Sequence, residues 1–388
     1  MPERFLLLFY FRLRGKLRWG TRRSRGFCLL FGWLSFILSF AIANHSQLDK
    51  EKERVFCFMK FSLRRLFSGV LAVSLIGGAA GLLCSCRRGF GEDAEGKVKV
   101  VATIFPVYDF AKRIGGDHVS VKMLIPAGTE PHEWEPSTND MLMLEEADLF
   151  VYSGAGMEPW AEDVLGSVQN KDLVALEASK GIALLKTEEV HDMEDDHEDD
   201  HEDEHDEDGH EHHHGMYDPH VWLSPKNAEA EMEAIAEALI AIDEENADYY
   251  RKNLEEAKKS CEELDSAFRE GLKPYEGGYI VVAHEAYGYL CREYGLKQIG
   301  IEGVSADQEP DAARMREIID KVGEYGIKCI FFEELVDPKV AQTIADEAGC
   351  RTMALSPLDG LSKDDIDAGR DYFSVMQDNL KALVSSFE

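Results

Sequence analysis

The chain has 388 residues, of which 45% are apolar, so it is long enough for two domains with buried cores. Its formal charge of −32 at pH 7 would repel phosphate groups, which excludes nucleic acid as an expected partner. The charge is unevenly spread: residues 188–214 hold sixteen Asp and Glu and no Lys or Arg, which is half of the net charge. Such a segment buries too little apolar surface to fold, so we expect residues 188–216 to form a disordered loop.

The N-terminal part of the chain is basic and apolar. Residues 27–43, FCLLFGWLSFILSFAIA, are of borderline length for a transmembrane helix. From Met59, the stretch MKFSLRRLFSGVLAVSLIGGAAGLLCSC has a basic start, an apolar core and a small-residue exit, which is typical of an export signal. We therefore expect residues 59–85 to be a signal peptide and residues 1–58 to be an upstream extension that is not native. The alternative for residues 1–58 is a genuine membrane segment.

The cysteines also indicate export. Leu83-Cys84-Ser85-Cys86 resembles the lipobox of bacterial lipoproteins, with Cys86 as the lipid attachment residue. A lipid on Cys86 would anchor the protein to the outer face of the cytoplasmic membrane, with residues 86–96 as a tether. The later cysteines contain no CxxC pair, so they predict no cysteine zinc site. They could form a disulfide between Cys329 and Cys350, or remain buried free thiols. The four are Cys261, Cys291, Cys329 and Cys350.

Strand and helix patterns alternate through the first lobe, which we assign to residues 97–246. Alternation of this kind indicates a parallel sheet with helices on both faces. The expected strands are 97–103, 119–128 including the loop that follows, 148–154 and 172–179; the expected helices are 107–116, 137–147 and 157–168, the last with Pro159 inside its first turn.

Two helical patterns follow the acidic loop. Apolar residues recur with a helical period up to Ile242, break at 243–246 and resume in a segment rich in Glu and Lys with no interior Gly or Pro. We expect this segment, 247–272, to be a rigid helix that joins the first lobe to a second one at 273–388. In the second lobe the expected strands are 277–284, 297–303, 327–333 and 351–357, and the expected helices are 286–295, 310–326, 338–349 and 367–386. The predicted fold is therefore α/β, with two lobes that each hold a mostly parallel sheet flanked by helices.

Three histidines share one setting. His132 lies in PAGTEPHEWEPS after a strand, His220 lies in DPHVWLSP, and His284 ends the strand YIVVAH. Ligands collect where the strands of open α/β sheets end, and neutral imidazole is a common zinc ligand. A single histidine of this kind would more often be a hydrogen-bonded structural residue. Three of them on two lobes, beside a histidine-rich loop, favour a metal site.

At these motifs the chain resembles the cluster A-I substrate-binding lipoproteins of ABC transporters for zinc and manganese. The resemblance covers about residues 97–388 and is carried by PHEWEPS, DPHVWLSP, NADYYRKN, AHEAYGYLCREYGL and LSPLDGL. It implies that His132, His220 and His284 bind the metal between the lobes. It also implies that Asp359 completes the shell, where the zinc-binding relatives from Gram-positive bacteria carry a carboxylate in a PLEGL-like turn. Because Asp is one methylene shorter than Glu, water is the alternative fourth ligand.

The resemblance implies an extracytoplasmic lipoprotein that captures Zn2+ and delivers it to an ABC permease and its ATPase, most simply as a monomer. Three nitrogens and one carboxylate oxygen suit tetrahedral zinc, whereas manganese prefers more oxygen ligands. Manganese members of the family usually carry Glu where this chain has His284, so Mn2+ is the secondary ion. An adhesin or a zinc-storage lipoprotein is the alternative function. A zinc hydrolase would need a general base, and Glu133, Glu135 and Glu285 adjoin the histidines, but no HExxH motif is present.

The acidic segment adds a second set of histidines. Their irregular spacing suits several weak, exchanging sites rather than one rigid site, and the carboxylates around them would raise the local cation concentration. We expect this loop to collect zinc near His220, and an inert surface insertion is the alternative. The residues are His191, His197, His201, His205, His210, His212, His213 and His214.

Overall fold

The computed structural model describes residues 90–91, 94–187, 217–304 and 310–388. These residues belong to one compact unit, Arg87–Glu388. The predicted extension, signal peptide and Cys86 lie outside the described residues, as does the histidine-rich loop at 188–216. In the described part of the chain, no helix has both the length and the apolarity to cross a membrane.

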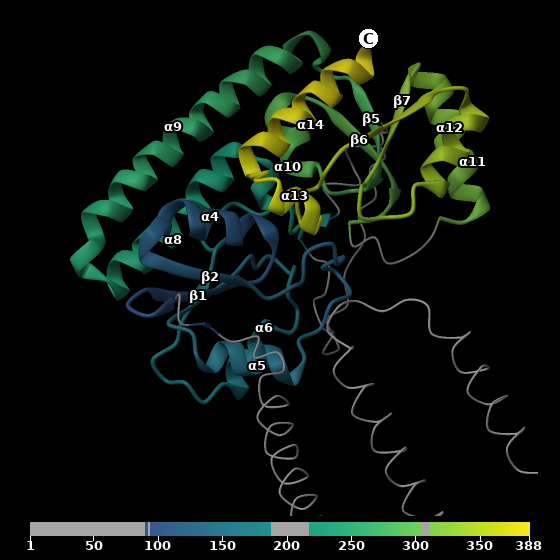
Figure 1. Cartoon of the computed structure of the whole chain (residues 1–388). Coiled ribbons are helices and arrows are strands. Elements are labelled where there is room, and N and C mark those ends of the chain that lie inside the picture. Colours follow the sequence, from purple (N-terminus) through teal and green to yellow (C-terminus); the bar gives the residue numbers. More distant parts are fainter. Residues whose placement is uncertain (1–89, 92–93, 188–216, 305–309) are drawn as a thin grey trace, which may run out of the picture. The chain divides into compact units, whose positions relative to one another are not determined.

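The first lobe is built on a four-stranded parallel sheet with the order β2-β1-β3-β4. The register places Val98 beside Val119 and Val100 beside Leu149, so the apolar runs of the sequence become the buried centre of the sheet. Figure 1 shows this lobe with α4 and α8 close to the sheet and α5 and α6 nearby. The strands are β1 (Val98–Ala102), β2 (Val119–Met123), β3 (Leu149–Tyr152) and β4 (Val174–Glu177), and the helices are α4 (Phe105–Gly115), α5 (Thr138–Glu145), α6 (Ala161–Ser167) and α8 (Pro225–Ile242).

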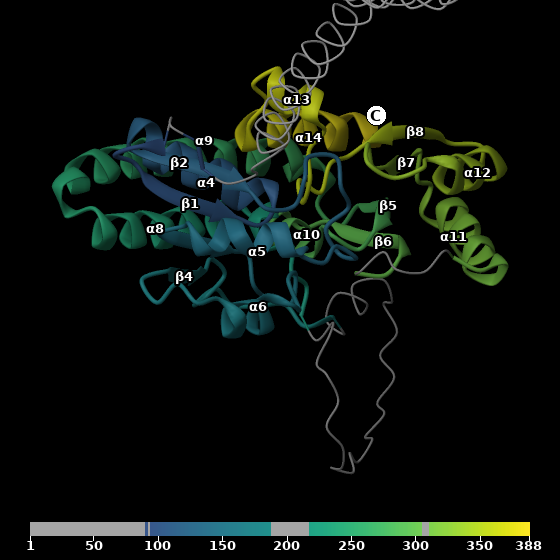
Figure 2. The same cartoon turned by 60° about the horizontal axis from the view of Figure 1, so that its bottom comes forward.

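The second lobe repeats this topology with a parallel sheet of order β6-β5-β7-β8. In each sheet the first strand of the lobe lies between the second and the third, so the chain adds one strand on one side of it and the next on the other side. The topological switch point of each sheet is therefore beside this first strand. Figure 2 shows α11 and α12 beside this sheet. The strands are β5 (Tyr279–His284), β6 (Lys297–Glu302), β7 (Cys329–Phe332) and β8 (Arg351–Ala354), and the helices are α10 (Gly288–Tyr294), α11 (Ala312–Tyr325), α12 (Lys339–Ala348), α13 (Lys363–Asp367) and α14 (Tyr372–Phe387).

Side chains of the second sheet alternate between two apolar cores, as successive residues of a strand must. Ile280 and Val282 lie in the large core shared with the first lobe, whereas Val281 lies in a smaller core under α11 and α12. The same alternation separates two cysteines: Cys329 is part of the large core, and Cys350 packs against the smaller one on the other face. All four cysteines of the described residues are free, so the structure favours the free-thiol alternative over a disulfide.

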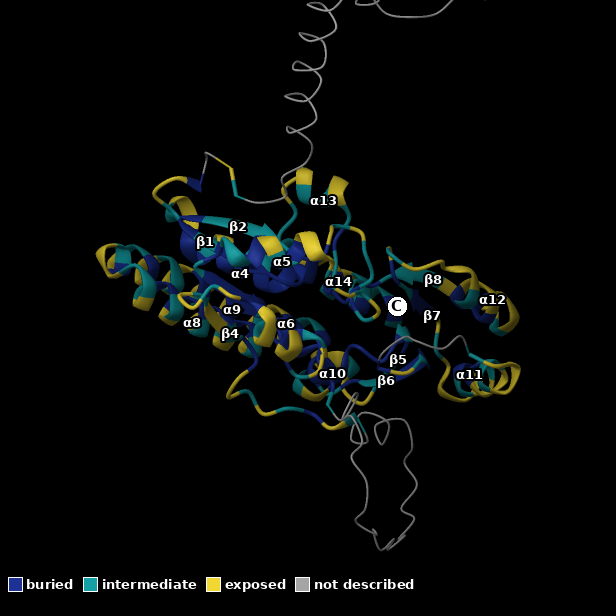
Figure 3. Ribbon diagram, turned by 90° about the horizontal axis from the view of Figure 1, so that it is seen from below, coloured by how far each residue is buried: buried dark blue, intermediate teal, exposed yellow. Residues whose placement is uncertain are grey.

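The long helix α9 (Ala247–Leu272) has the bounds that the sequence predicts. Its buried stripe includes Tyr250, Cys261 and Phe268, which pack into the large core. The helix contacts α8 and α4 of the first lobe and α14 and α10 of the second (Figure 1). It is therefore packed along both lobes rather than standing free between them, and only its outer face is exposed (Figure 3).

Sequence and structure differ at three helix ends. Helix α6 begins at Ala161, so Pro159 precedes the helix instead of lying in its first turn. Helix α4 begins two residues earlier than predicted, because Pro106 is tolerated in a first turn. The terminal helix expected at 367–386 begins later, at Tyr372, after a capping box at Asp371, and a short helix that was not predicted, α13, ends before Gly369, whose φ is +81°.

Candidate metal centre

Four side chains from both lobes converge on one point. His132, His220, His284 and Asp359 each offer one ligand atom, and these atoms all lie within 4.8 Å of one another. His132 lies in the loop after β2, and His284 is the last residue of β5. His220 immediately precedes a 3-10 turn (Val221–Leu223), and Asp359 follows β8. Each group thus lies beyond the carboxyl end of a strand or in the connection to α8, the position expected for ligands of parallel sheets.

The three imidazoles face one another through the same ring nitrogen. Nε2 of His220 lies 3.3 Å from Nε2 of His132 and 3.2 Å from Nε2 of His284. Ligands of a tetrahedral zinc ion with bonds of about 2.0–2.1 Å are about 3.3–3.4 Å apart. The two distances from His220 therefore match edges of a zinc tetrahedron, and His132 and His284 offer their ligand atoms within 4.8 Å of each other.

The segment around His220 is fixed by buried hydrogen bonds. The indole Nε1–H of Trp222 donates to the carbonyl of Pro357 at 2.7 Å, and the hydroxyl of Tyr372 donates to the carbonyl of Trp222 at 2.7 Å. Both bonds are buried, and each joins residues more than 100 positions apart. The first bond ties the DPHVWLSP motif to the turn that carries Asp359, and the second ties it to the start of α14.

Asp359 lies in a turn with unusual backbone geometry. Leu358 is fully buried and has a φ of +64°, a conformation that costs a non-glycine residue free energy and is concentrated at functional sites. Gly360 follows, and a Cβ there would lie 3.2 Å from the carbonyl oxygen of Thr129 in the first lobe. The nearest atom to that Cβ would be Cδ1 of Leu335 at 2.9 Å, so the turn and the first lobe leave little room for a side chain at this position.

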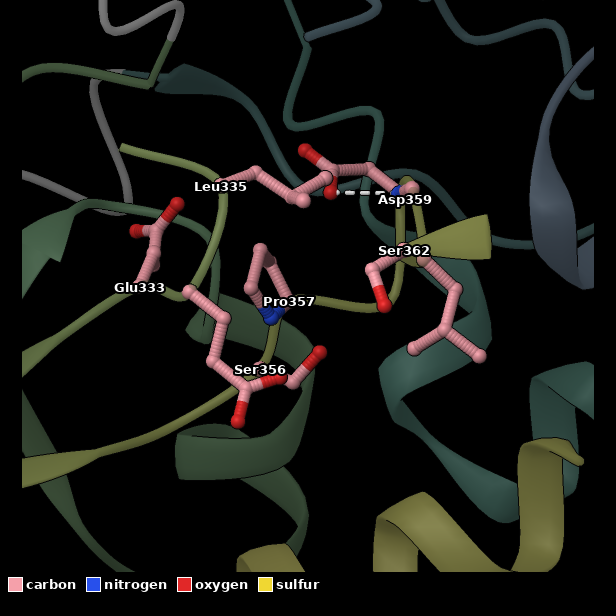
Figure 4. A pocket seen from close by; sticks show the side chains of 9 residues that line it. Glu333, Leu335, Ser356, Pro357, Asp359 and Ser362 are labelled. Carbon is pink, nitrogen blue, oxygen red and sulfur yellow. Dashed lines mark hydrogen bonds between the residues drawn. The ribbon is translucent and has the colours of Figure 1, made fainter. Parts of the chain in front are cut away.

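Asp359 and Glu333 line one small hollow with Ser356 and Pro357 (Figure 4). Its volume is about 10 Å³, close to what one water occupies. Oδ1 of Asp359 accepts a hydrogen bond from the backbone N–H of Gly360 at 2.7 Å. The four ligand atoms lie within 4.8 Å of one another. At this spacing the short side chain of Asp359 could bind the metal directly through an oxygen or through a water between the carboxylate and the metal.

The histidine pKa values differ strongly within the site. Burial, helped by the charge of His284, lowers the pKa of His132 to about 3, and burial holds the pKa of His220 well below 6.5. Burial also acts to lower the pKa of His284, but the charge and hydrogen bond of Glu333 outweigh it and raise this pKa to about 9. Burial, followed by the charge of Glu333, raises the pKa of Asp359 to about 7. At neutral pH the imidazoles of His132 and His220 are therefore neutral, whereas that of His284 is protonated when no metal is bound.

Three acidic residues at the site do not follow from the sequence analysis. Asp218 contacts the ring of His220, Glu333 contacts the ring of His284, and Glu130 accepts the backbone N–H of His132 at 3.1 Å. The sequence features that could have pointed to two of them are weak: Asp218 lies in the same Pro-containing motif as His220, and Glu333 directly follows β7.

The acids considered as general bases for a hydrolase lie in different environments. Glu133 and Glu135 are exposed, and Glu285 is buried beside His284. The eight loop histidines lie outside the described residues, so the structure leaves their expected role as a prediction.

Comparison with known proteins gives one consistent family. Residues 100–386 match the family described as ZnuA, zinc-uptake complex component A, periplasmic. The high-affinity zinc uptake system protein ZnuA of Bacillus subtilis is 41% identical over 303 residues, which cover 78% of this chain and 91% of that protein. The zinc-binding lipoprotein AdcA of Streptococcus pneumoniae is 40% identical over 292 residues, 75% of this chain, but the match spans only 56% of AdcA.

A solved structure agrees with these relatives. The Zn(II)-bound ZnuA-like domain of Streptococcus pneumoniae AdcA superposes with a TM-score of 0.62 at 37% sequence identity, covering 75% of this chain and 99% of that domain. The long helix, the second sheet, the four converging ligand candidates and all of the first sheet except the first two residues of β1 lie within the matched region. The chain belongs to the ZnuA family of zinc-uptake binding proteins.

Proposed function

We propose that this protein binds Zn2+ outside the cytoplasm and delivers it to an ABC-type importer made of a permease and an ATPase. The observation that carries the proposal is the meeting of three histidine Nε2 atoms from two lobes at spacings of 3.2 and 3.3 Å. The family and the relatives named above are zinc-uptake proteins, which favours transport over the adhesin and storage alternatives.

Zinc is favoured over manganese by the donor set. Three imidazole nitrogens with at most one or two oxygens suit zinc, whereas manganese prefers sites dominated by oxygen. The proposed ligands are His132, His220, His284 and Asp359, with a water as the alternative to Asp359. Capture rather than catalysis is favoured because the matching family and the Bacillus subtilis relative are both named for zinc uptake.

The proposal includes the position of the protein in the cell. Cys86 would carry the lipid that holds a monomeric binding protein at the outer face of the cytoplasmic membrane, within reach of the permease. Globomycin, which blocks lipoprotein signal cleavage, should then cause the precursor to accumulate, and Cys86→Ser should release the protein from the membrane fraction.

The loop histidines would form a separate, weaker set of zinc sites. Deletion of residues 191–214 should leave one tight site and remove the weak ones in a calorimetric titration. An unchanged stoichiometry after the deletion would contradict collection of zinc by the loop.

The central test is zinc binding by the purified protein, measured by metal analysis and by competition with a chelator. The wild type should bind one Zn2+ tightly, and His220→Ala or His284→Ala should abolish that site. His118→Ala is the matched control, because the ring of His118 packs edge-on against Tyr249 with centroids 4.5 Å apart and His118 is not among the four ligand candidates. If the control lost as much affinity as the other two variants, the proposed site would be wrong.

Delivery needs a separate test in cells. In a strain that lacks its zinc-binding protein, the wild-type gene should restore growth in medium depleted of zinc by a chelator, and His284→Ala should not. Growth restored by the variant would exclude the site from transport.

A further inference from the structure

Two of the three histidines are held from behind by buried carboxylates. Nδ1–H of His220 donates to Oδ1 of Asp218 at 2.9 Å, and Nδ1–H of His284 donates to Oε1 of Glu333 at 2.7 Å. All four side chains are at most 7% exposed. A hydrogen bond at Nδ1 fixes the ring orientation and leaves the Nε2 lone pair for a metal ion.

The two carboxylates reach their histidines by different routes. Asp218 is two residues from His220, and its Oδ1 also accepts the backbone N–H of His220 at 2.9 Å, so one oxygen holds both the backbone and the ring. Glu333 comes from the end of β7, 49 residues away from its histidine. Strands β5 and β7 are paired neighbours, and their carboxyl ends bring Glu333 and His284 together at the switch point of the second sheet.

Further contacts hold Asp218 in place. The hydroxyl of Tyr289 donates to the backbone carbonyl of Asp218 at 2.9 Å, and the same hydroxyl accepts the backbone N–H of Leu185 at 3.0 Å. The segment that carries His220 is thus fastened to α10 of the second lobe.

His132 is different. It is more exposed than the other ligand candidates, and its contact with a carboxylate is made through the backbone, where its N–H donates to Oε1 of Glu130. Among the described residues its ring has hydrogen-bonding geometry only toward His220. The site therefore consists of two fixed rings and one ring with less support.

We propose that Asp218 and Glu333 are positioning residues for zinc: they hold His220 and His284 as a preorganised pair of ligands. This inference rests on the proposed zinc-binding function and assigns a role to two residues outside the ligand set. Loss of such supporting partners commonly reduces metal affinity about 10- to 100-fold.

The test compares neutral and truncated replacements of each carboxylate. Glu333→Gln and Asp218→Asn keep an oxygen that can accept the Nδ1–H, whereas Glu333→Ala and Asp218→Ala remove it. We expect zinc affinity to fall about 10- to 100-fold in the alanine variants and less in the amide variants. The matched control is Glu231→Gln, which replaces a fully buried acidic side chain on α8 that makes no hydrogen bond to a histidine within the described residues.

A spectroscopic measurement distinguishes a positioning role of the two carboxylates from a purely structural one. Co2+ bound in place of zinc reports ligand geometry through its visible absorption, and the alanine variants should change that spectrum while Glu231→Gln should not. If an alanine variant does not fold, an apolar replacement of similar size, Glu333→Met or Asp218→Leu, also lacks the acceptor and carries the test; wild-type affinity and spectrum in that variant overturn the proposal for that residue.

The outcomes distinguish this inference from the proposed function. A wild-type protein that binds no zinc refutes the function itself. A wild type that binds zinc tightly, together with alanine variants that bind it equally tightly, refutes only the positioning role. Partial recovery in the amide variants relative to alanine supports it.

Discussion

Zinc affinity should change with pH at higher pH values than it would if the site held only ordinary histidines. An unperturbed imidazole has a pKa of about 6.5, so the sequence alone predicts that affinity falls only below that pH. In the structure, burial would lower the pKa of His284, but the charge and hydrogen bond of Glu333, with Asp359 and Glu130, raise it to about 9. Zinc must therefore displace a proton from His284 at neutral pH.

The size of the effect follows from the distance between the pH and the pKa. One pH unit below the pKa corresponds to about 1.4 kcal/mol, or about a factor of ten in apparent affinity. Between pH 9, where His284 is already half protonated, and pH 7 the apparent zinc affinity should thus fall about 50-fold, with close to one proton released per ion at pH 7. Below pH 7 the slope should become steeper, because burial raises the pKa of Asp359 to about 7 and a second proton then competes.

The assay is competition with a chelator of known pH dependence at pH 6, 7, 8 and 9. Calorimetry in two buffers of different ionisation enthalpy counts the released protons. Glu333→Gln provides the internal check: without the carboxylate charge the pKa of His284 should fall, so the affinity of this variant should level off at a lower pH than that of the wild type. Affinity that is flat between pH 7 and 9, with no proton released at pH 8, would refute the reasoning.

Other predictions concern stability. Burial and the nearby charge of Glu158 raise the pKa of Glu231 well above 4.5, so the folded state retains a proton that the unfolded chain loses above that pH, and stability falls as pH rises. Glu231→Gln should therefore raise the free energy of unfolding of the metal-free protein at pH 7 and change it less near pH 4; urea titrations that show no gain at pH 7 would contradict this. Trp222→Phe should lower stability by about 1–3 kcal/mol, because the buried carbonyl of Pro357 loses its donor, and a urea midpoint equal to that of the wild type would count against the bond. A reducing agent should leave the melting temperature unchanged, since the described cysteines are free; a drop of several degrees would reveal a disulfide.

The sequence predicts the fold well because each strand is a short β-branched or aromatic run with a helix after it. The predicted two-lobed α/β fold is confirmed, including the bounds of α9. The terminal helix was wrong at its start because the break depends on Gly369 adopting a positive φ and on the cap at Asp371, both of which are small local signals. Helix α6 was misjudged because Pro159 fits the turn before a helix as well as the first turn of one.

The residues of the site differ in whether the sequence alone could identify them. His132, His220 and His284 could be selected from the sequence because each lies at a strand end or in a proline-containing turn. Glu333 could not, because it becomes important only through the pairing of β5 with β7, which brings residues 49 positions apart into contact. The pKa values could not be predicted either, since burial lowers them for two histidines while a carboxylate raises the third. Residue type and spacing identify donors, but packing decides their protonation.

The junction between the lobes explains why metal loading should cause a small local change rather than a wide closure. The turn that carries Asp359 is already bonded to the first lobe: the backbone N–H of Gly128 donates to the carbonyl of Leu361 at 2.9 Å, and the indole of Trp222 donates to Pro357 at 2.7 Å. Helix α9 packs along both lobes and leaves little freedom for a hinge. A ligand can shift an equilibrium only through contacts that differ between the two states, and here the side chains still free to respond are His132 and Asp359. Hydrogen exchange should therefore slow on zinc addition mainly in the loops that carry these two residues, while the core of α9 exchanges at the same rate with and without metal.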